Sequence, residues 1–381
     1  MKYSIIVPCL DSSLIYLNET LPMLLEQNRQ DFEVIVSINP TGNNDYNSFS
    51  SLRDSRLRVI RPQFTLSMNQ HYEFALKHAR GAWIQVIGAD DFLTMHYFNS
   101  LDKILNRYPQ AQVINWTRAY YFWSSNPIIS PTQIDYPIRF GVTRVQNRFR
   151  TILSLLGITN FFDLPQIYTT SLISSQLIET LRRAGDGCLY HSIVPDVFSS
   201  LAIQSKSPIW IRSKKPLTWV GTSKSSFGLK NAINTDTNNG LICNRHDHNQ
   251  IHEIISHEVF LLKLGSVYLL EAYLNLKKTF KFENKSWECF LIGNLVADSV
   301  RLRFPASLRK QLFILVKTSP LTFLIGVGLS GLIVLCKILA RFFGGLLYYV
   351  EVKKNTRRIF PSKTNITPPE ANKIMAQDFQ H

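Results

Sequence analysis

The sequence Gly81-Ala82-Trp83-Ile84-Gln85-Val86-Ile87-Gly88-Ala89-Asp90-Asp91-Phe92-Leu93 carries the strongest structural signal in this chain. A short apolar run, typical of a buried strand, ends in two adjacent carboxylates. In open α/β sheets, ligands bind beyond the carboxyl ends of the strands, which is where these acids would lie. Adjacent carboxylates can hold a divalent metal, and a bound metal can hold a diphosphate. The alternative is an ordinary strand-to-helix turn in which Asp91 lies near a helix cap.

Strands and helices alternate through the first third of the chain. Runs typical of buried strands occur at Tyr3–Val7, Phe32–Val36, Leu57–Ile60, Trp83–Ile87 and Val113–Trp116. Between them, apolar side chains recur at helical spacing, first at Leu14, Leu17, Leu21, Leu24 and Leu25. This alternation predicts an α/β fold with a mostly parallel, doubly wound sheet of Rossmann type and helices on both faces.

The tips of the predicted strands define the expected ligand site. They lie at Pro8 to Asp11, at Ser37 to Asn39 and at Gly88 to Asp91. Neither GxGxxG nor GxxxxGKS/T occurs in these turns, so a dinucleotide fingerprint and a Walker loop are both excluded. A metal ion held by Asp90 and Asp91 is then the available group to meet the charge of a phosphate.

Composition narrows the classes of protein and of partner. The 381 residues are 45% hydrophobic and 18% charged, which is enough apolar material for a large core. The net charge of +15 suits nucleic acid, an anionic membrane or a phosphorylated substrate, but no nucleic-acid recognition motif accompanies it. The five cysteines form no CxxC pair, and the short apolar run after Lys2 does not match a signal peptide. We therefore expect a cytoplasmic protein without a nucleic-acid partner.

Six segments of the first ninety or so residues form one ordered set. They are Ser4-Ile5-Ile6-Val7-Pro8, Asp31-Phe32-Glu33-Val34-Ile35-Val36-Ser37, Asp54-Ser55-Arg56, Asn69, Ala79-Arg80-Gly81-Ala82-Trp83-Ile84 and Gly88-Ala89-Asp90-Asp91. In this order they resemble family 2 glycosyltransferases of the GT-A fold, of the bacterial surface-polysaccharide type. The resemblance is clear to about residue 125 and thinner to about residue 225.

The resemblance implies transfer of a sugar, hexosyltransferase-like, from a nucleotide-diphospho-sugar to an acceptor hydroxyl, usually with inversion and with Mn²⁺ or Mg²⁺. The metal-binding acid of the family falls on Asp90 and the acid after it on Asp91. Two usual acids are missing, because one falls on Gly88 and the other near Ile38, with Asn39 beside it. The expected donor-binding residues are Pro8, Cys9, Leu10, Asp11, Asn39, Asn69, Gly88, Ala89, Asp90 and Asp91.

A catalytic base is expected further along the chain, because inversion needs a group that deprotonates the acceptor hydroxyl. In the family this base is an acid that opens a helix. Asp196 fits that context, since it follows Pro195 and precedes residues at helical spacing. The alternative is an acid that only favours the helix N-terminus, and Asp186 and Asp163 are reserves.

Other polar and aromatic groups are weaker candidates. The loop Gly221–Gly228, with Lys224, is a candidate to close over a diphosphate, or is a plain flexible loop. His246, in His246-Asp247-His248, is a candidate third metal ligand, although a solvated surface cluster is the commoner reading. Trp123, in Tyr120–Trp123, is left open between acceptor stacking and core packing, whereas Phe122 is expected in the core. His71 and His78 are expected to be structural.

The last third of the chain reads as a membrane-contacting region. Pro320–Cys336 is nearly uncharged, Phe342–Val350 is apolar again, and basic residues flank both ends. Because charge lies on both sides, we expect a re-entrant or in-plane helix pair on the cytoplasmic leaflet; a true span is second and a buried core helix third. We expect a nucleotide-sugar-binding half at 1–125, an acceptor-binding half at 126–245, a helical membrane region at 246–360 and a flexible tail at 361–381.

The leading hypothesis is therefore a metal-dependent glycosyltransferase on the cytoplasmic face of the inner membrane. Its acceptor would be a glycan or a lipid-linked molecule in polysaccharide biosynthesis. A sugar-1-phosphate nucleotidyltransferase is disfavoured, because Cys9-Leu10-Asp11-Ser12-Ser13 is not the Gly-rich basic loop that such enzymes need. A catalytically degenerate GT-A protein, acting as a nucleotide- or glycan-binding or scaffolding subunit, stays open because of Gly88 and Ile38.

Overall fold

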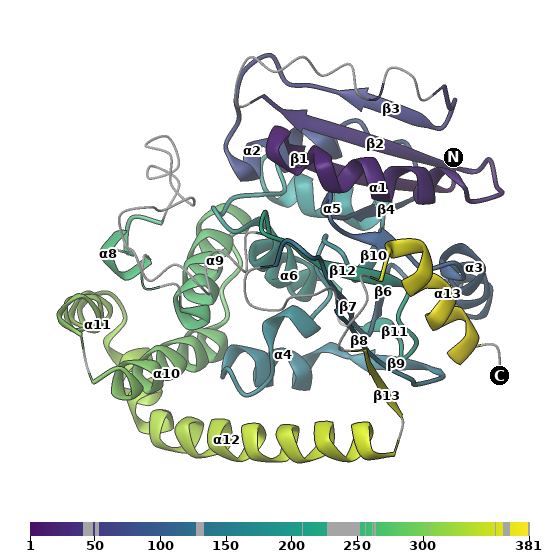
Figure 1. Cartoon of the computed structure of the whole chain (residues 1–381). Helices are drawn as coiled ribbons and strands as arrows, with labels where there is room; N and C mark the ends of the chain where they lie inside the picture. The colour runs from purple at the N-terminus through teal and green to yellow at the C-terminus, as the bar shows by residue number, and fades with distance from the viewer. Residues whose placement is uncertain are drawn as a thin grey trace.

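The structure is a computed structural model with two β-sheets and helices packed around them (Figure 1). It describes residues 1–40, 49, 53–126, 133–207, 209–226, 252–255, 257–260, 262, 264–303, 305–354, 356–360 and 366–379.

The larger sheet has eight strands in the order β3-β2-β1-β4-β10-β6-β11-β9. Its first four strands are parallel, and they are β3 (Leu57–Ile60), β2 (Phe32–Asn39), β1 (Tyr3–Leu10) and β4 (Trp83–Val86). The rest are β10 (Ser171–Ser174), β6 (Val113–Trp116), β11 (Ile209–Ser213) and β9 (Val142–Gln146). Strand β10 is antiparallel to both β4 and β6, so the sheet is parallel in its first half and mixed beyond β4.

Helices cover both faces of this sheet, as the alternating sequence pattern predicts. Tyr3, Ile5 and Val7 of β1 pack with α1 (Leu14–Leu25) and α3 (Tyr97–Arg107), whereas Ile6 faces the opposite core. That second core contains α2 (Met68–Leu76), α5 (Ser175–Ala184) and α6 (Pro195–Lys206). Successive side chains of a strand point to opposite faces, so a strand buried on both faces is apolar throughout.

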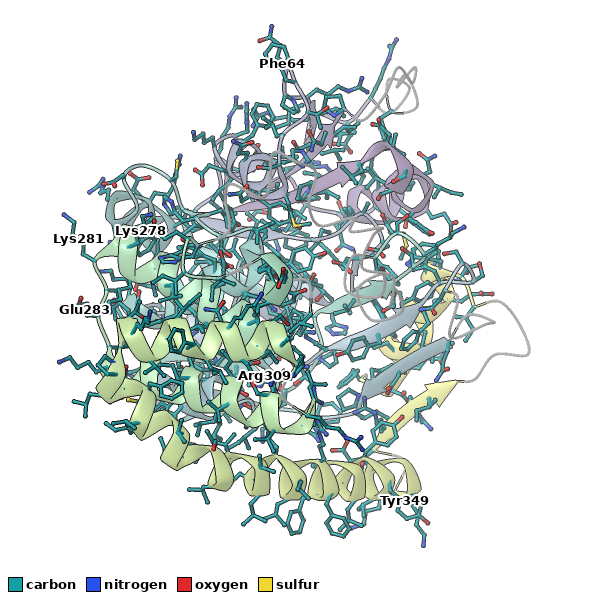
Figure 2. All side chains as sticks on the ribbon, turned by 90° about the vertical axis from the view of Figure 1, so that its left-hand side faces the viewer. Phe64, Lys278, Lys281, Glu283, Arg309 and Tyr349 are labelled. Carbon is teal, nitrogen blue, oxygen red and sulfur yellow. The ribbon has the colours of Figure 1, made fainter. Side chains whose placement is uncertain are left out.

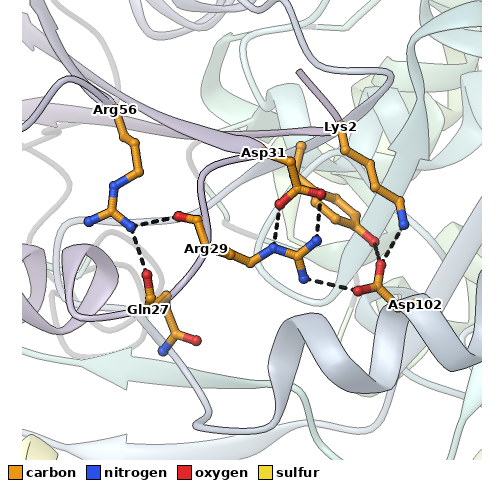
Figure 3. Close-up of polar contacts among 7 residues, drawn as sticks. Lys2, Gln27, Arg29, Asp31, Arg56 and Asp102 are labelled. Carbon is orange, nitrogen blue, oxygen red and sulfur yellow. Dashed lines mark hydrogen bonds and ion pairs between the residues drawn. The ribbon is translucent and has the colours of Figure 1, made fainter.

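A polar network fixes the amino-terminal end of β1 (Figure 3). Arg29 pairs with Asp31 and also with Asp102 of α3, at 3.0 Å in the second case. Asp102 in turn accepts hydrogen bonds from Lys2 and, at 2.6 Å, from the hydroxyl of Tyr3. Partly exposed ion pairs of this kind add little stability, so their effect is to hold α3 against the start of the central strand.

The second sheet has five strands in the order β13-β8-β7-β12-β5. They are β13 (Arg357–Phe360), β8 (Gln133–Pro137), β7 (Ala119–Phe122), β12 (Thr218–Thr222) and β5 (Phe92–Leu93). The two residues of β5 follow the acid pair directly and pair with Thr218 and Trp219 of β12. Asp90 and Asp91 therefore lie in the turn that joins one sheet to the other, which the sequence pattern alone did not show.

Helices dominate the region from residue 257 onward. They are α8 (His257–Phe260), α9 (Gly265–Phe280), α10 (Lys285–Arg301), α11 (Ala306–Thr318) and α12 (Pro320–Lys353). Helix α9 packs on α6, and α10 packs on α4 (Asn147–Leu155) and along α12. The expected pair of membrane helices is instead the single helix α12, because no residue between the two apolar segments breaks the helix.

Two expected boundaries are wrong. The helical region does not extend to residue 360, because β13 pairs with β8 and belongs to the second sheet. The tail is not flexible throughout, because Pro368–Asp378 forms α13, with a capping box between Thr367 and Glu370. Buried Ala371 and Met375 recur at helical spacing and give α13 an apolar side that packs on the second sheet.

Candidate active site

Asp91 is a buried acid that three donors hold. Its side chain is 2% exposed. It accepts hydrogen bonds from the backbone N–H of Gly88 and of Gly221, both at 2.7 Å, and from the hydroxyl of Thr169 at 2.8 Å. Burial and then the charge of Asp90 raise its pKa, while the N–H donors act in the opposite direction. Asp91 thus ties together the tip of β4, strand β12 and the segment before β10.

Asp90 is held by a different set of contacts. Its Oδ2 atom accepts hydrogen bonds from the hydroxyls of Ser223 at 2.7 Å and of Ser226 at 2.6 Å. Its backbone carbonyl accepts one from the indole of Trp123 at 3.0 Å. Burial raises the pKa of the Asp90 carboxyl, and the two serine hydroxyls lower it. The residues after β12 therefore reach back over the acid pair.

The close approach of the two segments needs glycine at position 221. A Cβ atom on Gly221 would lie 1.9 Å from the carbonyl oxygen of Asp90, which no side chain can tolerate. The glycine lets the Gly221 N–H reach Asp91 and positions Ser223 and Ser226 beside Asp90.

Gly88 occupies the position at which the family that this sequence resembles usually has an acid. The structure gives a steric reason for glycine there. A Cβ atom there would lie 2.9 Å from Oη of Tyr168, 3.0 Å from Oδ1 of Asp90 and 3.2 Å from Oδ2 of Asp91. Three oxygens already surround that point. A side chain at position 88 would have to displace the phenol or a carboxylate.

A group of tyrosines connects the acid pair to the start of α6. Tyr72 hydrogen-bonds to Tyr168, and its ring lies 5.8 Å from the ring of Tyr190 in an edge-to-face arrangement. Burial raises the pKa values of Tyr72 and Tyr168, and so do the charges of Asp90, Asp91 and Asp196. All three acids thus act electrostatically on the same two phenols, although Asp196 is more than a hundred positions further along the chain.

Asp196 lies in the first turn of α6, as the sequence predicts, with Pro195 before it. Its Oδ1 atom accepts a hydrogen bond from the Val197 N–H at 2.9 Å. Burial raises the pKa of Asp196, while the Val197 N–H and the charge of Arg118 lower it. Arg118 is itself anchored, because its guanidinium donates to the carbonyl of Phe162 at 2.9 Å and lies 4.7 Å from the Phe162 ring centroid.

The reserve acids lie elsewhere. Asp186 is exposed in the turn after α5, with a left-handed φ of 52°. Asp163 ends the 3-10 helix η3 (Phe161–Asp163), where its carbonyl accepts a hydrogen bond from Arg212 at 3.1 Å. Of the three acids, Asp196 is the one whose charge is among the main causes of the raised pKa values of Tyr72 and Tyr168.

The predicted donor residues at the tips of β1 and β2 lie side by side. Pro8 and Cys9 are buried opposite Ser37 and Ile38, and Leu10, 42% exposed, pairs with Asn39. Asp11 begins the 3-10 helix η1 (Asp11–Ser13), directly after this tip. Next to them, β4 pairs with β1 on the other side, and the N–H of Ile87 extends that pairing to Ile6. The register of three parallel strands therefore brings these tips to one edge of the sheet.

The remaining donor residues have local structural partners. The amide of Asn39 donates to the carbonyl of Leu66 at 2.7 Å and accepts from the Leu66 N–H at 2.9 Å. Asn69 accepts from Ser67 and from the Gln70 N–H in the first turn of α2. The carbonyl of Ala89 accepts from Thr20 of α1 at 3.0 Å.

The structure corrects one aromatic prediction. Trp123 is 4% exposed and packs against Tyr16 and Tyr121, with both centroid distances at 5.0 Å, so it positions Asp90 and presents no open stacking face. Phe122, which we expected in the core, is partly exposed, and its ring centroid lies 6.1 Å from that of Tyr120. The strand period explains both results, because alternate residues of β7 point to opposite faces.

The three histidines and the lysine that we considered from the sequence have different positions. His71 bonds to the hydroxyl of Ser37 at 2.9 Å, and burial lowers its pKa to about 4, while His78 bonds to the carbonyl of Phe74. Both are structural, as expected. His246 lies outside the described residues. Lys224 is exposed, and its N–H donates to Ser125 at 3.3 Å.

Four polar residues of the site were not predicted individually: Tyr168, Thr169, Ser223 and Ser226. The two serines lie in the Gly/Ser loop that the sequence did single out, but they bond to Asp90. Tyr168 and Thr169 precede a strand without any local motif, so nothing in their neighbourhood could have identified them.

The oxygen ligands of this site could hold a divalent metal only together with a substrate phosphate and water. Within the described part of the chain, no group of three or more His, Cys, Asp or Glu side chains is arranged to hold a metal ion. Magnesium needs no such protein cage, because one or two carboxylates, substrate phosphates and water complete its shell. Asp90 suits this arrangement better than Asp91, whose carboxylate already accepts three hydrogen bonds.

One known protein family matches the part of the chain that contains the acid pair. Residues 4–163 match the sequence model of the family described as glycosyl transferase family 2. A search of curated proteins found no match. Among solved structures, S. aureus TarS 1–349 in complex with UDP-GlcNAc is 14% identical, with a TM-score of 0.48, and the match covers 82% of this chain and 90% of that one.

The uncomplexed S. aureus TarS 1–349 is also 14% identical, with a TM-score of 0.45 and coverage of 88% of this chain and 90% of that one. Both scores lie below 0.5, so the assignment depends on the family match and on the strand order and acid pair described above. Residues 4–163 of this chain thus match glycosyl transferase family 2, and the chain has an α/β fold of GT-A type.

Proposed function

We propose that this glycosyltransferase moves a sugar from a nucleotide-diphospho-sugar to an acceptor hydroxyl, with inversion and with a divalent metal. The observation that supports the proposal is that Asp90, Asp91 and Asp196 all act electrostatically on the phenols of Tyr72 and Tyr168. The hydroxyl of Tyr168 and the carboxylates of Asp90 and Asp91 also surround the position of Gly88. A metal-binding acid and a base must lie on either side of one anomeric carbon, and this shared environment supports giving the two roles to Asp90 and Asp196.

Asp90 is the proposed metal ligand. A bound Mn²⁺ or Mg²⁺ would stabilise the negative charge that develops on the departing diphosphate. Asp91 has a positioning role in this scheme, since its three hydrogen bonds hold the turn that presents Asp90. Ser223 and Ser226 hold one oxygen of the Asp90 carboxylate in a fixed place. His246 remains a proposed third ligand.

Asp196 is the proposed base. Its carboxylate would take the proton of the acceptor hydroxyl while that oxygen forms the new bond to the anomeric carbon and the bond to the diphosphate breaks. A carboxylate with a raised pKa is a stronger base at neutral pH than an exposed one, and burial raises the pKa of Asp196. Attack opposite the leaving group inverts the anomeric centre.

The nucleotide would lie across the tips of β1 and β2. Leu10 is exposed there, and Pro8, Cys9 and Asn39 are buried beside it. We propose that Asp11, Asn69, Gly88 and Ala89 complete this donor surface. A hexose is the proposed transferred sugar.

We further propose a glycan or a lipid-linked molecule as the acceptor, in polysaccharide biosynthesis at the cytoplasmic face of the inner membrane. The support is the long exposed apolar helix α12 of the same chain, which would keep the enzyme near such acceptors.

A degenerate subunit that binds nucleotide or glycan without turnover is the second candidate. It is favoured by Gly88 and by Ile38, which is fully buried and replaces an acid that would meet the nucleotide.

Donor hydrolysis and thermal shift, measured with UDP-, GDP- and dTDP-sugars with and without Mn²⁺, test the proposal. A true donor should raise the melting temperature by several degrees, about as expected for ligand at 100 times its Kd. Asp90→Asn should abolish the Mn²⁺-dependent part of that shift, and Asp196→Asn should retain it while losing turnover. Asp186→Asn is the matched control, because it removes an exposed acid outside the site. Donor binding with no turnover across the panel would favour the degenerate subunit.

A further inference from the structure

Helix α12 is long, apolar and open to solvent. It has 34 residues, or roughly 51 Å at 1.5 Å per residue. By length and composition it is the one helix in the described part of the chain that could cross a membrane. Only 11% of its most apolar 18-residue stretch is buried. That exposure excludes a core helix. The most exposed apolar side chains include Leu321, Leu324, Ile338, Phe342, Leu346 and Tyr349.

The helix is fastened to the body of the protein at three places along its length. Near its start, Gly326 lies against Gly293 of α10, so closely that a Cβ on Gly293 would be 2.9 Å from the Gly326 carbonyl. In the middle, the Lys337 ammonium pairs with Asp298 of α10 at 3.1 Å. Near its end, Glu351 pairs with Arg139 and Arg357. The first and last of these places are roughly 38 Å apart along the helix.

These three contacts are incompatible with a helix α12 that crosses the bilayer. A bilayer core is about 30 Å thick, so a spanning α12 would carry α10 and the edge of the second sheet into the hydrocarbon. The elements at both ends of α12 pack on the rest of the protein: α11 precedes the helix, and β13 follows it and pairs with β8. Figures 1 and 2 show α12 along one edge of the molecule, with side chains such as Tyr349 extending away from it.

The segment that contains α11 and α12 is strongly positive, although Glu283 and Glu288 lie near the start of α12. Residues 301–354 contain nine Lys and Arg residues and a single acid, Glu351, which is buried and paired. On α12, Lys337 is already paired, so Arg341 is the only other cation between Pro320 and Val350. Five of the other cations lie on α11 or at the end of α12, and they are Arg309, Lys310, Lys317, Lys353 and Lys354; Arg301 ends α10 and Arg303 follows it.

We propose that α12 docks flat on an anionic phospholipid bilayer, with its apolar side chains below the headgroups and the cations of α11 and of the α12 end at the phosphates. Apolar side chains on a helix lying in the interface, together with clustered cations, are what binds proteins to one leaflet. A second copy of the chain is disfavoured as the occupant, because two such faces would bring their cations together. This docking does not depend on the proposed sugar transfer.

Vesicle flotation tests the docking. The full-length protein should float with vesicles of phosphatidylcholine and phosphatidylglycerol. Its affinity for vesicles of pure phosphatidylcholine should be at least about tenfold lower. Phe342→Glu with Leu346→Glu should abolish flotation, and Lys353→Gln with Lys354→Gln should weaken it about tenfold. Phe64→Glu, 69% exposed at the opposite end of the molecule, and Lys77→Gln are the matched controls and should bind normally (Figure 2). Donor hydrolysis of the same variants in solution should be unchanged, so a failure of docking and a failure of the transfer proposal are distinguishable.

Cysteine labelling distinguishes lying flat from spanning. In a background with Cys188, Cys243 and Cys336 changed to Ser, Thr318→Cys and Lys354→Cys mark the two ends of α12. With protein bound to the outside of sealed vesicles, an impermeant maleimide should label both ends. Protection of one end would show a span and overturn the proposal. A salt-insensitive dimer that Phe342→Glu with Leu346→Glu converts to a monomer, without flotation of the parent protein, would identify a second copy as the occupant instead.

Discussion

The carboxylate of Asp91 accepts a hydrogen bond at 2.7 Å from the backbone N–H of Gly221, 130 positions later in the chain. This bond joins the end of β4 to β12. It also brings the residues after β12 over the acid pair, where Ser223 and Ser226 reach Asp90. The order of the site therefore depends on the hydrogen bonds that the buried Asp91 accepts.

Replacing Asp91 by Ala should destabilise the whole fold. The change leaves the N–H groups of Gly88 and Gly221 and the hydroxyl of Thr169 buried without their acceptor. At about 1–3 kcal/mol for each unsatisfied group, the free energy of unfolding should fall by about 3 kcal/mol or more. Urea denaturation measures this loss. Asp186→Ala, at an exposed position, should change the same quantity by less than about 0.5 kcal/mol; an equal loss in both variants would contradict the structural role of Asp91.

Restoring an acid at position 88 should be destabilising in this chain. Gly88→Asp places a Cβ 2.9 Å from the hydroxyl oxygen of Tyr168 and adds a third carboxylate beside Asp90 and Asp91. We expect a loss of about 1–3 kcal/mol from overpacking. Gly88→Asp combined with Tyr168→Phe should recover part of it, because the nearest oxygen is then absent. Thermal unfolding of the two single variants and the double variant measures this coupling, and additive losses would show that Tyr168 is not the obstacle.

Activity should rise with pH through the titration of Asp196, because the base acts as a carboxylate. Burial raises the pKa of Asp196, and the charge of Arg118 lowers it. Arg118→Gln should therefore raise that pKa further and move the acidic limb of the kcat/KM profile to higher pH. Asp196→Asn should lower kcat by about 10²–10⁴-fold at every pH. A profile that is identical in Arg118→Gln and the parent enzyme would remove Asp196 as the titrating group.

Glu271 should make the protein less stable as pH rises. Burial raises the pKa of this α9 residue from 4.5 to about 8, against the opposing effect of hydrogen bonds such as the one from Ser192. The folded protein thus binds a proton that the unfolded chain releases between about pH 4.5 and 8, so the stabilising contribution present at low pH is lost across this window.

The loss should be on the order of a few kcal/mol. Glu271→Gln carries no titrating proton and should flatten that part of the profile. Urea denaturation between pH 5 and 8.5 measures the slope, with Glu179→Gln, an exposed glutamate on α5, as the control. A slope that persists in Glu271→Gln would assign it to another group.

The sequence by itself determined the alternating strands and helices, the acid pair at the end of β4 and Asp196 in the first turn of α6. These features are visible because hydrophobic period and helix-start chemistry are local properties of a few adjacent residues. The position of α12 also has a local signal, in its apolar composition, but composition cannot tell a helix that spans from one that lies flat.

Only the tertiary structure decided how those features meet. The bonds from Thr169 and Gly221 to Asp91 cross 78 and 130 positions, and the tyrosines that link Asp196 to the acid pair come from α2 and from the segment before β10. Such pairings depend on strand register and on packing between distant segments, for which no short stretch of sequence carries a pattern. The same reason explains why β5, β13 and α13 were not predicted: each forms because an already folded surface offers it a partner.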